Sequence, residues 1–239
     1  KLSRRDFLGK TSALGVSAAA AGTMFATVAR ADTPKKGGDF KLGSVGGEST
    51  NSLDPATYAS QVPFHNGKQF GDTLVDVTGD GSIKNILAES VESSADAKTW
   101  MFKMRKDVEF HNGKTMTAED VMKTMERHSN EDSKSGALGI MKGIESMKVD
   151  GDMFSVTLKD PNADLPYLMA DYHLIIQPNG GMDAPDAGIG TGPYILKEVD
   201  MGVRFIAEKN PNYWGDLGNA NEIEIVVIKG GFRSFKLRD

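Results

Sequence analysis

Short segments of alternating apolar and polar residues, separated by turns that contain glycine, constrain the fold of this chain most strongly. In residues 100–105, Trp100, Phe102 and Met104 share one side of an extended chain, while the basic residues between them take the other side. A strand with one buried face requires this pattern. Similar patterns predict strands at residues 40–42, 194–196, 203–207 and 223–228, and a hairpin over residues 147–158 with its turn at Asp150 and Gly151.

The same pattern predicts fewer helices than strands. Thr117 and Asp120 have the spacing of a capping box, in which side chains satisfy free backbone N–H groups, and Val121 and Met125 follow at helical spacing. A second, short helix is predicted over residues 164–174. Further turns are predicted at residues 79–81 and 112–113, and a loop or domain crossing at residues 178–192. Because no helix alternates regularly with strands before that loop, the sequence favours a mixed α+β lobe within the α/β class over a doubly wound sheet.

The composition fits a folded chain and narrows the classes of function. With 39% hydrophobic and 26% charged residues, the chain has enough apolar side chains for a core. It contains no cysteine, which excludes disulfides, thiolate metal sites and cysteine nucleophiles. The formal net charge of -5 argues against a nucleic-acid partner, because such binding depends on Lys and Arg neutralising phosphates.

The N-terminal segment, residues 1–31, has the pattern of an export signal. Residues 1–7 are basic, residues 8–28 are mildly apolar, and the segment ends in the small residues of a cleavage site. Residues 3–8 resemble the twin-arginine signal, which implies export of an already folded protein. The alternative is a membrane anchor, but a run rich in Ala, Gly, Ser and Thr and interrupted by Lys10 is a poor bilayer span.

No pattern of residues predicts a catalytic or metal site. Gly-Lys-Thr occurs at residues 9–11 and 113–115, but Arg4 and Val108 stand where a phosphate loop needs glycine. Residues 76–81 resemble the start of a calcium loop but lack its later glutamate. The four histidines are far apart in the sequence: His65, His111, His128 and His173. Distant residues can converge on a metal, so spacing alone leaves that alternative open. We expect no catalytic residue, no metal and no cofactor.

Eight stretches of the chain occur together in one known family. They are residues 37–43, 52–55, 87–90, 99–105, 108–114, 117–121, 190–194 and 210–214. The last two read Gly190-Thr191-Gly192-Pro193-Tyr194 and Asn210-Pro211-Asn212-Tyr213-Trp214. In order and separation the stretches resemble the solute-binding proteins of peptide- and nickel-type ABC importers, the extracellular solute-binding protein family 5. Each stretch is weak alone, whereas the set is specific.

The resemblance implies a periplasmic binding protein-like fold of type II, in which two lobes close on a solute. It implies a first lobe built from residues 32–57 and 184–239, with an extra domain, residues 58–183, inserted between them. Family members continue well beyond the Asn-Pro-Asn-Tyr-Trp stretch, and residues 230–239 do not continue the family pattern. The resemblance therefore implies an incomplete copy without the second lobe and with weakened solute affinity, because such sites bury the ligand between two walls.

The resemblance also assigns solute contacts to four consecutive residues: Tyr58, Ala59, Ser60 and Gln61. In peptide-binding relatives this stretch pairs its backbone groups with the main chain of the ligand, which is a strand-addition mode. The alternative is an ordinary exposed loop. Tyr194 and Trp214 are aromatic residues that could serve as ligand platforms, but we expect them to pack in the core of the lobe.

The function implied by the resemblance is that of a periplasmic receptor for an ABC importer. Such a receptor is not an enzyme: it captures a peptide or a related small solute and delivers it to permease subunits in the membrane. A nickel, haem or opine receptor of the same family is an alternative. An exported hydrolase with an unrecognised site is an alternative of a different class, and a fragment without activity is a third.

Overall fold

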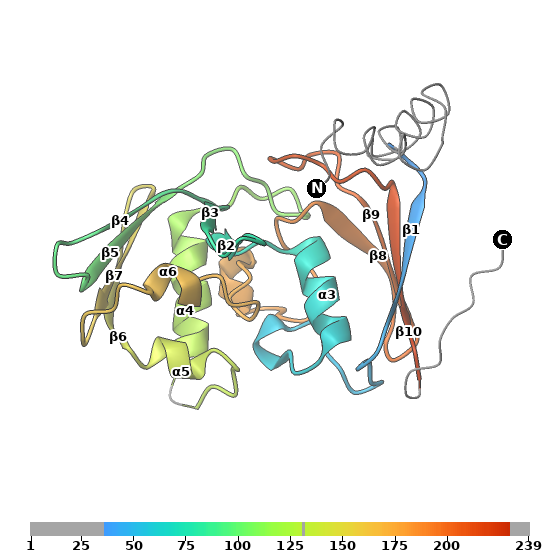
Figure 1. Ribbon diagram of the computed structural model, residues 1–239, viewed down its shortest axis with the longest axis horizontal. Helices are drawn as coiled ribbons and strands as arrows, with labels where there is room; N and C mark the ends of the chain where they lie inside the picture. The colour runs from blue at the N-terminus through green and yellow to red at the C-terminus, as the bar shows by residue number, and fades with distance from the viewer. Residues whose placement is uncertain (1–35, 131, 230–239) are drawn as a thin grey trace, which may run out of the picture. The chain divides into compact units, whose positions relative to one another are not determined.

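The computed structural model describes residues 36–130 and 132–229 (Figure 1). The predicted export signal at residues 1–31 lies outside these ranges. Every element below lies in the second of the two units into which the chain divides, residues 39–239. Within the described ranges, no helix combines the length and the apolar character that crossing a bilayer requires.

One four-stranded sheet joins the beginning of the second unit to its end. Its strands are β1 (Asp39–Ser44), β8 (Tyr194–Asp200), β9 (Arg204–Lys209) and β10 (Glu222–Val227), in the order β1-β10-β9-β8. β1 runs parallel to β10, with Leu42 opposite Ile225, and the other pairs are antiparallel. Figure 1 shows the blue strand β1 beside β10. The four strands predicted in these regions are confirmed.

A second four-stranded sheet comes from the middle of the chain and is entirely antiparallel. Its strands are β4 (Ala88–Ser93), β5 (Thr99–Met104), β6 (Ile144–Asp150) and β7 (Met153–Leu158), in the order β4-β5-β7-β6. The alternation predicted for residues 100–105 is confirmed, because Trp100, Phe102 and Met104 are all buried. The predicted hairpin is β6 followed by β7.

A small hairpin of β2 (Val75–Val77) and β3 (Ile83–Asn85) holds the turn predicted at residues 79–81. The Asp80 carboxylate accepts hydrogen bonds from the Ser82 N–H and the Thr78 hydroxyl, and Gly81 has a φ of 84°. A positive φ is a conformation that glycine adopts without strain. The calcium-loop-like residues 76–81 therefore have a structural role as a turn.

Helix α4 (Ala118–Ser129) begins with the predicted capping box. Asp120 N–H donates to Thr117 Oγ1 at 3.3 Å, and Thr117 N–H donates to Asp120 Oδ2 at 2.9 Å. Val121 and Met125 are fully buried, as their spacing predicts. A short helix, α5 (Leu138–Met141), follows it in the chain.

The helix predicted over residues 164–174 is shorter than predicted. Only α6 (Leu165–Leu168) is helical. Its continuation is interrupted at Asp171, whose side-chain Oδ1 accepts a hydrogen bond from the His173 N–H at 2.9 Å and so stabilises a turn. Asp side chains compete with helical hydrogen bonds in this way.

Helix α3 (Gln61–Phe70) was not predicted from the sequence. Its sequence contains Pro63 and Gly67, which are poor helix formers. Pro63 lies in the first turn, where proline is tolerated. Gly67 leaves room for the Tyr58 ring, because a Cβ at position 67 would lie 2.6 Å from that ring. The helix contacts β8, β9 and β10. The predicted boundary at residue 58 would assign it to the inserted domain, and the domain boundaries stay a prediction.

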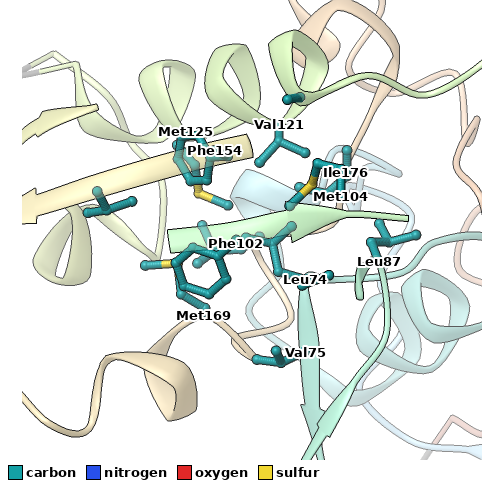
Figure 2. Close-up of a cluster of buried hydrophobic side chains, with 14 of the residues drawn as sticks. Leu74, Val75, Leu87, Phe102, Met104, Val121, Met125, Phe154, Met169 and Ile176 are labelled. Carbon is teal, nitrogen blue, oxygen red and sulfur yellow. The ribbon is translucent and has the colours of Figure 1, made fainter. Parts of the chain in front are cut away.

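The buried side chains form two clusters. The larger cluster lies around β5, β7 and α4 and includes Phe102, Met125 and Phe154 (Figure 2). The smaller cluster joins α3 to the first sheet, and its members are Leu53, Tyr58, Val62, Phe70, Ile175, Phe205 and Ile225. The two clusters meet at residues 174–176, since Leu174 and Ile176 belong to the larger cluster and Ile175 to the smaller one. Residues 178–192 are a loop, as predicted, apart from a short 3-10 helix, η2 (Pro178–Gly181).

Candidate functional site

The carboxyl ends of the parallel strands β1 and β10 mark one candidate region. Binding sites in sheets with parallel strands lie outside the carboxyl ends of those strands. After β1, Gly46 has a φ of 77°, and a Cβ on Gly47 would lie 2.7 Å from Val227 and 3.1 Å from Val62. The backbone of residues 46–47 therefore lies against the end of β10 and the start of α3.

The four residues predicted to contact solute lie at the start of α3, and they differ in exposure. Tyr58 is only 3% exposed, and its hydroxyl donates to the Leu53 carbonyl at 3.0 Å. Burial, followed by the negative charge of Asp54, raises the pKa of Tyr58, so the phenol is neutral. The side chain of Tyr58 therefore has a role in the core, and its backbone is the part that a solute could use.

The next three residues lead into α3. Ala59 is exposed, Ser60 is the extended N-cap residue of α3, and Gln61 is exposed in the first turn. The structure gives the Ala59 N–H and carbonyl no hydrogen-bond partner among the residues it describes. An N–H and a carbonyl that no described residue bonds can pair with the main chain of another strand. That residues 58–61 contact solute stays a prediction.

Three contacts tie the loop before this segment to residues 127–173. Asp54 forms an ion pair with Arg127 of α4, with the two side chains 14% and 16% exposed. The Gly136 N–H donates to the Ala56 carbonyl at 3.0 Å. His173 Nε2 lies 2.8 Å from the Tyr58 carbonyl oxygen. The position of residues 54–60 is therefore set from a distant part of the sequence, which sequence patterns could not indicate.

His128 is a buried neutral histidine beside these contacts. It is fully buried, with Nδ1 2.5 Å from Ser135 Oγ, and Nε2 has no partner within the described part of the chain. Burial, followed by the positive charge of Arg127, lowers the pKa of His128 from 6.5 to about 4. His128 lies in the last turn of α4, with its side chain turned into the protein interior.

The lowered pKa of His128 predicts that the chain loses stability in acid. Between about pH 6.5 and about pH 4 the unfolded chain binds a proton at His128 that the native state excludes, so the free energy of unfolding falls as the pH falls. We expect the titration of His128 to lower the free energy of unfolding by about 3 kcal/mol over this pH range. Urea unfolding at a series of pH values measures it. His128→Gln, which has no titrating ring, is the control, and an equal loss in that variant would contradict the assignment.

A second buried cluster joins two of the stretches that resemble the family. Asp72 accepts hydrogen bonds from Thr191 Oγ1 at 3.1 Å and from Trp214 Nε1 at 3.3 Å, and burial raises the pKa of Asp72. The Trp214 ring also packs under Arg105, with the guanidinium carbon 4.5 Å from its centroid. Tyr194 is 4% exposed. The expectation of packing in the core is confirmed for Tyr194, whereas Trp214 is half-buried and packs against the larger cluster.

One contact resembles a pair of catalytic residues. Ser44 Oγ lies 3.1 Å from His65 Nδ1 at the end of β1. A serine nucleophile also needs a third group that orients the histidine, and no carboxylate of the described residues hydrogen-bonds His65. Within the same ranges no group of three or more His, Cys, Asp or Glu side chains could hold a metal ion.

Comparison with known proteins finds one matching family and several relatives. The model of the bacterial extracellular solute-binding proteins, family 5 Middle, matches residues 82–233. The chain is 29% identical over 186 residues to the nickel-binding periplasmic protein of Escherichia coli strain K12, covering 74% of this chain and 35% of that protein. It is 26% identical over 201 residues to the oligopeptide-binding protein AppA of Bacillus subtilis, covering 77% and 36%.

The fold is similar to that of solved binding proteins. The structure of AgaA from A. tumefaciens R10 in complex with agropinic acid superposes with a TM-score of 0.72 at 26% identity, covering 80% of this chain and 40% of that one. The chain thus spans about a third of the length of the curated relatives named above.

Proposed function

Because the chain belongs to family 5 of the bacterial extracellular solute-binding proteins, we propose that it acts as a receptor that holds a peptide or a related small solute. The receptor delivers the solute to permease subunits of an ABC importer at the outer side of the membrane. Export by the twin-arginine segment at residues 1–31 brings it to the periplasm. The first lobe consists of residues 32–57 and 184–239, and residues 58–183 form the inserted domain.

The observation that carries this proposal is the unpaired backbone of Ala59. Its N–H and carbonyl lie at the start of α3, next to the carboxyl ends of β1 and β10, and no described residue bonds them. A peptide in extended form offers one carbonyl and one N–H per residue at the spacing that such a segment can pair with. Backbone pairing makes few demands on side chains, which suits a receptor for peptides of varied sequence.

The proposal also holds that the chain performs no chemistry on its solute. The Ser44 and His65 contact is the arrangement that a hydrolase would most plausibly use, and it has no orienting carboxylate in the described ranges. Ser44 is 4% exposed, so its hydroxyl is poorly placed to attack a solute. Purified chain incubated with peptides and esters should give no product, and Ser44→Ala should make no difference.

A substitution at Ala59 tests the backbone pairing. Ala59→Pro removes the N–H, and Tyr58 at φ -64° and ψ 123° already has a conformation that is allowed before proline. No internal hydrogen bond is lost, since the N–H has no described partner. We expect affinity for a short peptide such as trialanine to fall about tenfold. Isothermal titration of the purified chain measures the affinity.

Ala59→Val is the matched control, because it changes the side chain and keeps the N–H. It should bind trialanine as the unchanged chain does. Equal losses in both variants would contradict backbone pairing. Failure of the chain to bind any member of a panel of peptides, glutathione and nickel chelates would reject the receptor proposal for this chain.

A receptor for nickel or an opine is the second candidate. The relative from Escherichia coli is named a nickel-binding protein, and the AgaA structure contains agropinic acid. The same titrations, carried out with nickel–histidine and with an opine, separate the candidates. Binding of either ligand with Ala59→Pro unaffected would favour the second candidate over the peptide receptor.

A further inference from the structure

His173 connects the candidate site to a carboxylate. Its Nδ1 lies 2.7 Å from Asp171 Oδ1, and its Nε2 lies 2.8 Å from the Tyr58 carbonyl oxygen, 115 residues away in the sequence. The side chain of His173 is 8% exposed and that of Asp171 29%. The ring therefore bridges a charged acceptor and a main-chain acceptor with little access to water.

Both ring nitrogens of His173 face oxygen atoms that accept hydrogen bonds. A carbonyl oxygen can only accept, and so can an ionised carboxylate. Each nitrogen must then carry a proton, which makes the ring an imidazolium. Burial opposes the charge, but the hydrogen bonds with Asp171 and the Tyr58 carbonyl prevail and raise the pKa of His173. Burial also acts on Asp171, but the hydrogen bonds from the ring and the backbone N–H of His173 prevail and lower the pKa of Asp171.

The ring is also fixed by packing. A Cβ on Gly136 would lie 2.3 Å from His173 Nε2, so only glycine allows the ring to lie there. On another side the Tyr172 ring has its centroid 4.1 Å from that of His173. Gly136 itself donates to the Ala56 carbonyl, two residues before Tyr58. The position of the Nε2 donor is thus set by several contacts.

We propose that His173, held by Asp171, is a positioning residue that engages the Tyr58 carbonyl and leaves Ala59 as the residue that pairs with solute. This inference rests on the proposed function. Tyr58 N–H donates to the Pro55 carbonyl, so both main-chain groups of Tyr58 are engaged. A solute that pairs with the main chain of Ala59 must offer both an N–H and a carbonyl. An extended peptide offers both, whereas a metal chelate need not.

The geometry makes this contact dependent on pH. When the ring loses a proton, the remaining proton stays on Nδ1 beside the carboxylate, and Nε2 presents a lone pair to the Tyr58 carbonyl. The contact is then lost as the pH rises. Asp171, on the same turn, is the charged side chain in contact with His173. Burial and, to a smaller extent, the charge of His173 lower the pKa of His128 on α4, and Arg127 and Asp54 act on that same histidine. His128 is neutral above about pH 4 and does not compete for the proton.

NMR spectroscopy of the purified chain without solute tests the proposal. We expect the long-range proton–nitrogen spectrum to show both ring nitrogens of His173 protonated below its pKa, with the Tyr58 carbonyl carbon shift titrating at the same midpoint. In His173→Phe, amide hydrogen exchange should accelerate by at least about tenfold at Tyr58 and Gly136, whose N–H groups donate to the Pro55 and Ala56 carbonyls, while exchange at Val121 in α4 stays unchanged. His173→Gln, whose Nε2 can donate to the carbonyl, should restore slow exchange.

The proposal would be overturned if the Tyr58 carbonyl and the His173 ring titrated independently. It would also be overturned if amide exchange accelerated equally at Tyr58 and Val121. The wild-type titration decides the matter if His173→Phe does not fold. None of these measurements uses a solute. They can therefore succeed even where the Ala59→Pro titration rejects peptide binding, so failure of the positioning role and failure of the proposed function give different results.

Discussion

Gly192→Ala is expected to destabilise the chain by about 4 kcal/mol or to prevent its folding. A Cβ at this position would lie 2.5 Å from the Phe70 carbonyl carbon and 2.6 Å from the Gln69 carbonyl oxygen. These are backbone atoms at the end of α3, which cannot rotate away as a side chain can. Gly192 is also held in place, since its N–H donates to the Phe70 carbonyl at 3.0 Å.

Urea unfolding of the purified chain measures this effect. Gly139→Ala is the matched control, because a Cβ there meets nothing within 4 Å and Gly139 lies within α5. Alanine at a compatible helical position leaves stability unchanged or raises it slightly. A Gly192→Ala variant as stable as the Gly139→Ala variant would show that the loop and α3 are not in close contact.

Arg127→Ala is expected to cost about 4 kcal/mol of stability. The variant leaves the Asp54 carboxylate, 14% exposed, with the Ala56 N–H as its remaining donor among the described residues. An uncompensated charge at such a place is destabilising, whereas the intact pair offsets its own desolvation. Because Asp54 begins the loop that leads to Ala59, amide exchange at Tyr58, whose N–H donates to the Pro55 carbonyl, should accelerate as well.

Lys106→Ala provides the comparison for this prediction. Lys106 Nζ lies 3.8 Å from Asp152 Oδ2, and its side chain is 75% exposed. Pairs on the surface contribute from nothing to about 1 kcal/mol, so this variant should unfold almost as the unchanged chain does. If chemical denaturation gives the two variants the same stability, the pair of Arg127 and Asp54 does not anchor the loop.

The elements that the sequence predicted correctly depend on local patterns. Alternation fixes the buried face of β5 regardless of its neighbours in space, and the capping box at Thr117 satisfies backbone groups three residues away. Helix α3 escaped prediction because its stability comes from packing on the first sheet, which outweighs the poor propensity of Pro63 and Gly67. A sequence pattern contains no information on such a partner.

The candidate site was predictable only in part. The resemblance located the segment that follows Leu53, but the burial of the Tyr58 side chain and its contact with His173 depend on residues 115 positions apart. His173 had no distinctive pattern around it. Gly136 was equally unremarkable, and its lack of a side chain has meaning only beside the His173 ring. Contacts of this kind follow from the fold and not from spacing along the chain.

The stretch of residues 174–176 has a consequence for how the protein loses its structure. Its side chains point alternately into two separate apolar interiors, so neither interior can open without exposing part of the stretch that completes the other. Such sharing couples the two halves energetically, and heat or denaturant disrupts them together in a single cooperative step.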